Sequence, residues 1–154
     1  MPTDSGEFAS PLFNLLKETF ENPMGIFLDP DTSLLQTLET ISSDQASIPV
    51  GGKCASLAAQ VAHVTFFIES FERYALQHDE SPVDWGHIWK TVERVDPEEW
   101  NKLKANLKEA YLRMDKLFHT NPVWNEETIG GALSILVHSA YHLGEIRQAL
   151  CVLQ

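Results

Sequence analysis

Apolar residues recur every three or four positions over several long stretches of the chain, which is the period of an amphipathic helix. The first such stretch predicts a helix over residues 10–20, with Ser10 as its N-cap and Pro11 at its first helical position. A second apolar run covers residues 34–41, after a segment with several prolines. This run is either a separate helix or the continuation of one broken helix.

The pattern is helical again over residues 56–76, and it weakens between residues 77 and 95. We interpret this weaker segment as a loop with one short helical turn. Its two tryptophans, Trp85 and Trp89, either line a pocket or form a lid over the end of the core, and we favour the lid.

Two further helices have clear start signals. Asp96 is the expected N-cap of a long helix that Asn121–Pro122 closes. Asn125 is the expected N-cap of a last helix that runs from about residue 126 to the C-terminus. No segment has the alternating pattern of a strand.

These helices predict an all-α fold, namely an antiparallel four-helix bundle, either alone or with an extra short N-terminal helix. The length of 154 residues and the hydrophobic content of 44% fit one domain that spans residues 1–154. The core of such a bundle is a place where side chains from facing helices can build a metal or cofactor site.

The balance of charges argues against two classes of partner. The chain has 11 basic and 22 acidic side chains, a formal net charge of −11. Because Lys and Arg supply the affinity for nucleic acid and for anionic membranes, neither is an expected partner. We see no signal peptide and no apolar run long enough for a membrane helix, and we expect a cytoplasmic protein. Cys54 and Cys151 form no C-x-x-C motif, so we interpret both as structural residues.

The last helix contains two histidines four residues apart. His138 and His142 lie about 40° apart on a helical wheel, on the same stripe as Ile135 and Ala149, and so face the core. Burying their nitrogens without partners costs about 1–3 kcal/mol each, and a bound metal would supply a partner. Such pairs also arise by chance, and Ser139 stands where a metalloprotease helix has glutamate.

A third histidine, His63, lies on the core-facing side of the helix over residues 56–76. Taken alone, it is more often a hydrogen-bonded core residue than a ligand. Together, His63, His138 and His142 are candidates to bind one divalent ion of zinc, nickel or iron, and three ligands leave a coordination position open. Glu145 lies on the same stripe of the helix as the two histidines. It is a candidate base, a candidate hydrogen-bond acceptor behind a metal ligand, or simply a hydrogen-bonded residue. We expect the mouth of the site to be flanked by Tyr74, Trp85 or Trp89.

These residues carry a resemblance to the DinB family of bacterial, damage-inducible four-helix-bundle proteins. It rests on the turn Gly51–Gly52–Lys53, on Ala62–His63–Val64, and on the sequence His138-Ser-Ala-Tyr-His142-Leu-Gly-Glu-Ile-Arg-Gln. The resemblance covers about residues 34–150 and puts the family's metal ligands on His63, His138 and His142. The sequence departs from the family pattern in two places. Cys54–Ala55 stands where Trp-Ser is common in the family, and the first helix is interrupted between Pro23 and Pro30.

The resemblance implies a metal-binding bundle, often a homodimer, in a superfamily that includes transferases and isomerases dependent on bacillithiol, mycothiol or glutathione. The first hypothesis is therefore a metal-dependent S-transferase or isomerase that uses a small-molecule thiol and an electrophilic substrate. The alternative is a non-catalytic, stress-linked helical protein that binds metal or a partner without turnover. The sequence identifies neither the substrate nor a catalytic residue beyond the ligands.

Overall fold

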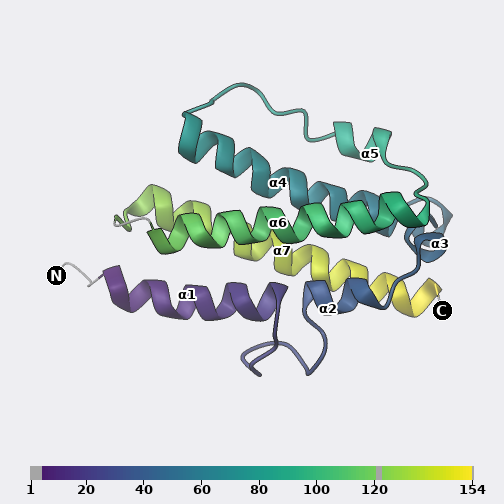
Figure 1. The fold of residues 1–154 in the computed structure, drawn as a ribbon, viewed down its shortest axis with the longest axis horizontal. Helices are drawn as coiled ribbons and strands as arrows, with labels where there is room; N and C mark the ends of the chain where they lie inside the picture. Colours follow the sequence, from purple (N-terminus) through teal and green to yellow (C-terminus); the bar gives the residue numbers. More distant parts are fainter. Residues whose placement is uncertain (1–4, 121–122, 154) are drawn as a thin grey trace.

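The computed structural model describes residues 5–120 and 123–153, and every regular element within them is a helix (Figure 1). This confirms the all-α expectation, and no strand occurs in the described ranges. The elements are α1 (Ser5–Phe20), α2 (Leu34–Glu39), α3 (Ser43–Ala46), the 3₁₀ turn η1 (Val50–Gly52), α4 (Leu57–Gln77), α5 (His87–Thr91), α6 (Pro97–Thr120) and α7 (Glu126–Leu153).

The two long helices α4 and α6 run in the same direction, whereas α7 runs opposite to both (Figure 1). Arg113, late in α6, pairs with Glu72, late in α4, at 3.0 Å. Tyr74 at the end of α4 donates a hydrogen bond to Glu127 at the start of α7. The expectation of an antiparallel arrangement is therefore wrong for α4 and α6, because the connection over residues 78–96 returns along the length of the molecule before α6 begins.

The start signals predicted for α6 and α7 are confirmed. Asp96 Oδ1 accepts the backbone N–H of Glu99 at 2.8 Å, and the Glu99 carboxylate accepts the N–H of Asp96 at 2.9 Å. Asn125 Oδ1 accepts the N–H of Thr128 at 2.9 Å. These bonds satisfy backbone donors that a helix start leaves free. The expected end of α6 at Asn121–Pro122 lies outside the described residues.

Helix α1 begins earlier than predicted. Ser10 is not its N-cap, since the helix starts at Ser5 and Pro11 lies inside it. A proline inside a helix loses a hydrogen bond and disturbs the preceding turn. Packing favours the additional turn, because Ala9 is buried and the ring of Phe8 meets that of Trp124 at 6.3 Å.

α1 and α2 are separate helices, joined by a loop over residues 21–33 that a buried carboxylate holds in place. Glu18 accepts backbone N–H groups from Ile26, Phe27 and Leu28 at 2.7–3.0 Å. Burial alone would raise the pKa of Glu18, but these hydrogen bonds together keep it below its ordinary value. The charge on Glu18 therefore organises the loop.

The hydrophobic core combines buried side chains from α1, α2, α4, α6 and α7. Its polar members have partners: the indole N–H of Trp100 donates to the carbonyl of Ile41 at 2.8 Å, and Tyr111 donates to Glu21 at 2.6 Å. α4 packs against both α6 and α7, and α1 packs against α7. Helix α4 is therefore the central element on which a site can be built.

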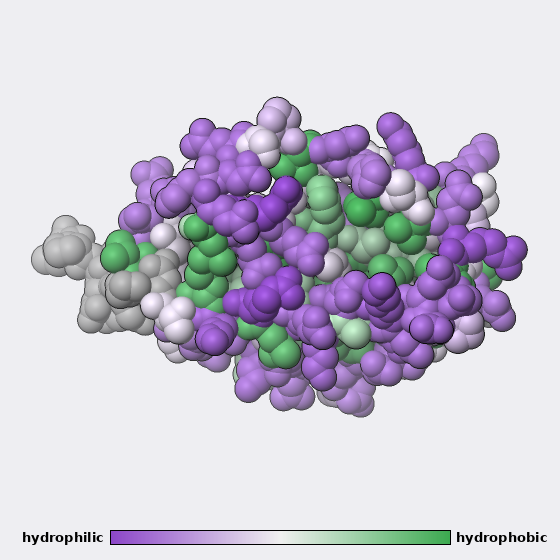
Figure 2. All heavy atoms as spheres, turned by 45° about the horizontal axis from the view of Figure 1, so that its top comes forward, coloured by the Kyte–Doolittle hydropathy of each residue, from purple (hydrophilic) through white to green (hydrophobic). Residues whose placement is uncertain are grey.

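The face shown in Figure 2 is mostly hydrophilic, and apolar residues appear on it in groups between hydrophilic ones. Among the described residues, none of the individual helices has both the length and the apolarity to cross a membrane. Ser43–Gly52 and Leu57–Gln77 meet that test only as a pair, with a 97° bend between them.

Candidate metal centre

The three predicted histidines lie together between α4 and α7. The ring centroid of His63 is 5.0 Å from that of His138 and 5.0 Å from that of His142, and the two α7 rings are 4.6 Å apart. One nitrogen from each ring lies within 4.8 Å of the others. Tetrahedral ligands of a zinc ion lie roughly 3.3 Å apart, so the rings would draw in slightly around an ion.

These imidazoles are buried, and their nitrogens lack partners. His63 is 7% exposed and His142 is 5% exposed, while His138 is half-buried. Nδ1 of His63 and Nε2 of His138 are shielded from solvent and have no hydrogen-bond partner within the described part of the chain. Buried polar atoms are nearly always paired, so two such atoms in one cluster mark it as a candidate binding site.

The surroundings keep all three rings neutral at pH 7. Burial, followed by the nearby rings of His142 and His63, lowers the pKa of His138 to about 4. Burial is also the largest cause that lowers the pKa of His63 and of His142, although Glu145 opposes the shift in both cases. Neutral imidazole is the form that binds a metal.

Glu145 lies one helical turn after His142, and its Oε2 is 2.9 Å from Nδ1 of His142. The pair is at contact distance, but the ring is not aligned for a hydrogen bond. A hydrogen bond to Glu145, followed by its negative charge, raises the pKa of Tyr141. Glu145 therefore sets the electrostatics behind one candidate ligand, as expected for an acceptor near a metal-binding histidine.

Aromatic side chains enclose the cluster. The indole of Trp89, in α5, lies 4.4 Å from His63, and Phe67 stacks on His138 at 3.8 Å. Trp85 contacts Phe66 and Phe67 instead, at 5.8 and 5.6 Å. The short helix α5 confirms the predicted turn, and both tryptophans cover α4 from that connection while remaining partly exposed.

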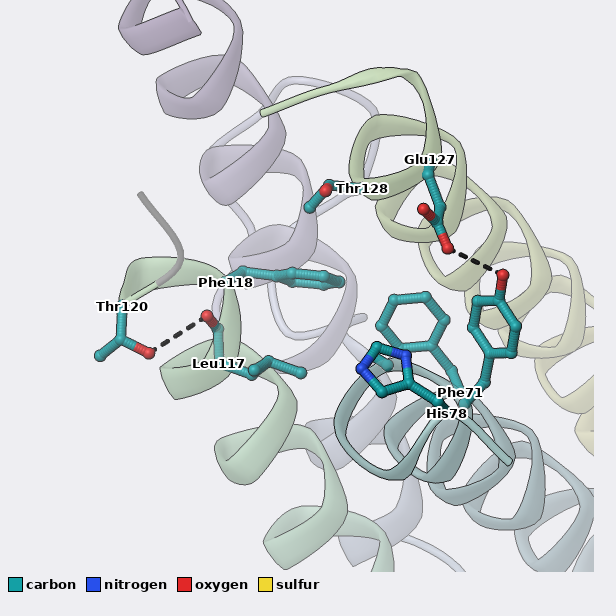
Figure 3. A pocket seen from close by; sticks show the side chains of 9 residues that line it. Phe71, His78, Leu117, Phe118, Thr120, Glu127 and Thr128 are labelled. Atoms are coloured by element: carbon teal, nitrogen blue, oxygen red, sulfur yellow. Dashed lines mark hydrogen bonds between the residues drawn. The ribbon is translucent and has the colours of Figure 1, made fainter. Parts of the chain in front are cut away.

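Tyr74 does not flank this site, contrary to expectation. It lies eleven residues after His63 on α4, about 16 Å along the helix axis, and donates a 2.7 Å hydrogen bond to Glu127. There it borders a separate pocket of about 300 Å³ at the other end of α4, where Phe71, Phe118 and His78 also lie (Figure 3). A shared helical stripe does not make two residues neighbours when they are three turns apart.

The histidine cluster faces two pockets. A polar one of about 640 Å³ reaches His142 and is also lined by Gln60, Lys53 and Glu145. An open, more apolar one of about 530 Å³ reaches His138 and is lined by Phe67, among others. The arrangement can therefore admit ligands of different character from two sides.

Several residues of the polar pocket, Cys54 and Gln60 among them, were not predicted as site residues. Cys54 was interpreted as structural, but it is exposed and lines this pocket, and Cys151 is exposed as well. Gln60 is 7% exposed, and its Oε1 has no partner among the described residues. Its position one turn before His63 was the available signal, because residues three apart on a helix share a face.

Comparisons of the chain with protein-family models, with curated proteins and with solved structures found no match.

Proposed function

We propose that His63, His138 and His142 bind one divalent metal ion, and that the protein is a metal-dependent enzyme. The observation that carries this proposal is the convergence of three neutral imidazoles, each with a buried nitrogen that has no hydrogen-bond partner among the described residues. Imidazole suits zinc, nickel and iron, so the donor set fits all three ions.

The three histidines are the only candidate ligands in this cluster within residues 5–120 and 123–153. Three protein ligands are typical of a catalytic site, whereas a structural zinc site is closed by four. A bound ion of this kind lowers the pKa of a thiol or water that coordinates it. The polar pocket beside His142 gives a small reactant access to this position.

The reaction class that we propose is transfer or isomerisation dependent on a low-molecular-weight thiol, with an electrophile as the second reactant. The two pockets support this reaction class, because they reach the same histidine cluster from two sides. The pocket at His142 is polar, and the pocket at His138 is more apolar. Trp89 and Phe67 shield the cluster in between and reduce its contact with water.

Calorimetric titration of the zinc-loaded protein with N-acetylcysteamine tests this reaction class. Because burial lowers the pKa values of the histidines, the rings are neutral at pH 7 and hold no imidazolium proton, so a proton released on binding comes from the thiol. We expect about one proton per bound thiol, measured as a difference in heat between two buffers of different ionisation enthalpy. Metal binding with no thiol-dependent heat would favour the non-catalytic alternative.

We also propose that α1, α4, α6 and α7 form a four-helix bundle of the DinB type in a cytoplasmic homodimer. The packing of α4 against α6 and α7, and of α1 against α7, supports the bundle. The resemblance to the DinB family, whose members are often homodimers, supports the dimer. Sedimentation that finds only a 17.3 kDa species at micromolar concentration would contradict the dimer.

A further inference from the structure

A buried glutamine that lines the polar pocket has an unused hydrogen-bond acceptor, shielded from solvent, behind the pocket wall. Gln60 is 7% exposed, lines the pocket together with His142, and has no partner for its Oε1 within the described residues. The other buried polar side chains of α4 differ in this respect: Thr65 and Ser70 donate to carbonyls one turn earlier, at 3.0 and 2.7 Å. Among the buried polar side chains of α4, only Gln60 and the candidate ligand His63 have an atom without a hydrogen-bond partner in the described part of the chain.

A structural role does not account for this amide. An unsatisfied buried acceptor costs about 1–3 kcal/mol, whereas an apolar residue of similar shape would avoid that cost. The position of Gln60 one turn before His63 instead directs its side chain to the same space as the candidate ligands.

We infer that Gln60 is a substrate-positioning residue that selects a reactant with an N–H donor. The proposal rests on the function proposed above, because it concerns the thiol that enters the polar pocket. The N–H group of that thiol donates to Gln60 Oε1 while its sulfur is held at the histidine centre. A thiol without the donor leaves the acceptor unsatisfied and binds more weakly.

The pocket has the remaining features that this selection needs. Trp89 and Tyr141 offer aromatic surface on its walls, and Lys53 and Glu145 place one charge of each sign at its edge. Neither Lys53 nor Glu145 is a hydrogen-bond partner of Gln60 Oε1, so a reactant that displaces the pocket wall slightly finds this acceptor unused.

Two probes that differ in one group test the inference. N-acetylcysteamine carries an amide N–H, and 2-mercaptoethyl acetate has an ester oxygen in its place, with nearly the same shape. Binding of each to cobalt-loaded protein is followed by the thiolate-to-metal charge-transfer absorption. We expect the wild type to bind the amide about tenfold more tightly than the ester, the size of one hydrogen bond to a buried acceptor.

The variants separate positioning from folding. Gln60→Met keeps the length of the side chain without the amide, and should reduce the preference to about one while cobalt content stays unchanged. Gln60→Glu retains an acceptor and should keep the preference. The matched control, Gln148→Met, changes an exposed glutamine of α7 that lines neither pocket, and should behave as wild type.

An equal affinity of the wild type for both probes would overturn the inference, as would a tenfold preference that persists in Gln60→Met. Loss of cobalt from Gln60→Met would overturn it too, because Gln60 would then belong to the metal site. Each of these results leaves the proposed thiol function intact. Absence of the thiolate absorption with both probes would instead remove the thiol function and the inference together.

Discussion

The two ends of α4 carry pockets that differ in how their polar groups are satisfied. Near its start, His63 meets the α7 histidines, and buried nitrogens there have no partner. Near its end, Tyr74 also meets a polar residue of α7, but its hydroxyl donates to Glu127 at 2.7 Å (Figure 3). At the first end these nitrogens have no partner among the described residues, whereas at the second end the Tyr74 hydroxyl has one.

This difference separates a functional polar cluster from a structural one. Both ends have aromatic walls and a cavity, so neither of these features distinguishes them. What distinguishes them is the unpaired donor set of neutral imidazoles, since unpaired buried polar atoms are costly and therefore rare. The comparison predicts that changes at the first end alter metal affinity, and that changes at the second end alter only stability.

The largest expected effect beyond the ligands themselves is at Glu145. Glu145→Gln removes the negative charge beside Nδ1 of His142 while keeping the size of the side chain. We expect zinc affinity to fall by about 10- to 100-fold, because an acceptor behind a histidine ligand raises its basicity and fixes its orientation. Competition with a chromophoric chelator measures this change. An unchanged zinc affinity would mean that the charge of Glu145 does not support His142 as a metal ligand.

A smaller effect, on stability alone, is expected at the other end. A methyl group at Gly131 of α7 would collide with the ring of Phe71, which lines the pocket in Figure 3. Gly131→Ala should therefore lower the free energy of unfolding by about 1–3 kcal/mol, the usual range for overpacking. Denaturant unfolding of the metal-free protein measures it.

Gly130→Ala is the matched control for this substitution. No atom lies within 4 Å of a methyl group added there, so the change should stabilise α7 by about 0.5–1 kcal/mol through helix propensity. Both glycine variants should keep the zinc affinity of the wild type. A loss of affinity in Gly131→Ala would show that the two ends of α4 are coupled, contrary to the comparison.

Sequence patterns were sufficient for the helical class, for the caps at Asp96 and Asn125, and for placing each of the three histidines on the core-facing side of its helix. These features depend on local spacing, and a helix turns the same side chains to one face wherever it lies. The direction of α6 relative to α4 could not be predicted in this way, because it depends on the path of the 78–96 connection, which has no strong pattern.

The remaining errors have the same origin in tertiary structure. Pro11 resembled a helix start, but packing around Phe8 and Ala9 extends α1 beyond it. Tyr74 shares a stripe with His63, yet its distance along α4 puts it in the other pocket. Gln60 was missed because the sequence does not show whether a side-chain acceptor has a hydrogen-bond partner. That becomes visible only when the positions of the surrounding atoms are known.

The central claim is that His63, His138 and His142 hold one ion, and zinc titration of metal-free protein with X-ray absorption of the product tests it most directly. We expect one zinc per chain, with three imidazole nitrogens at about 2.0–2.1 Å. His142→Ala should lose this binding, whereas His119→Ala, which changes an exposed histidine stacked on Phe13, should retain it. Equal zinc binding by wild type and His142→Ala, or no binding by the wild type at one equivalent, would contradict the claim.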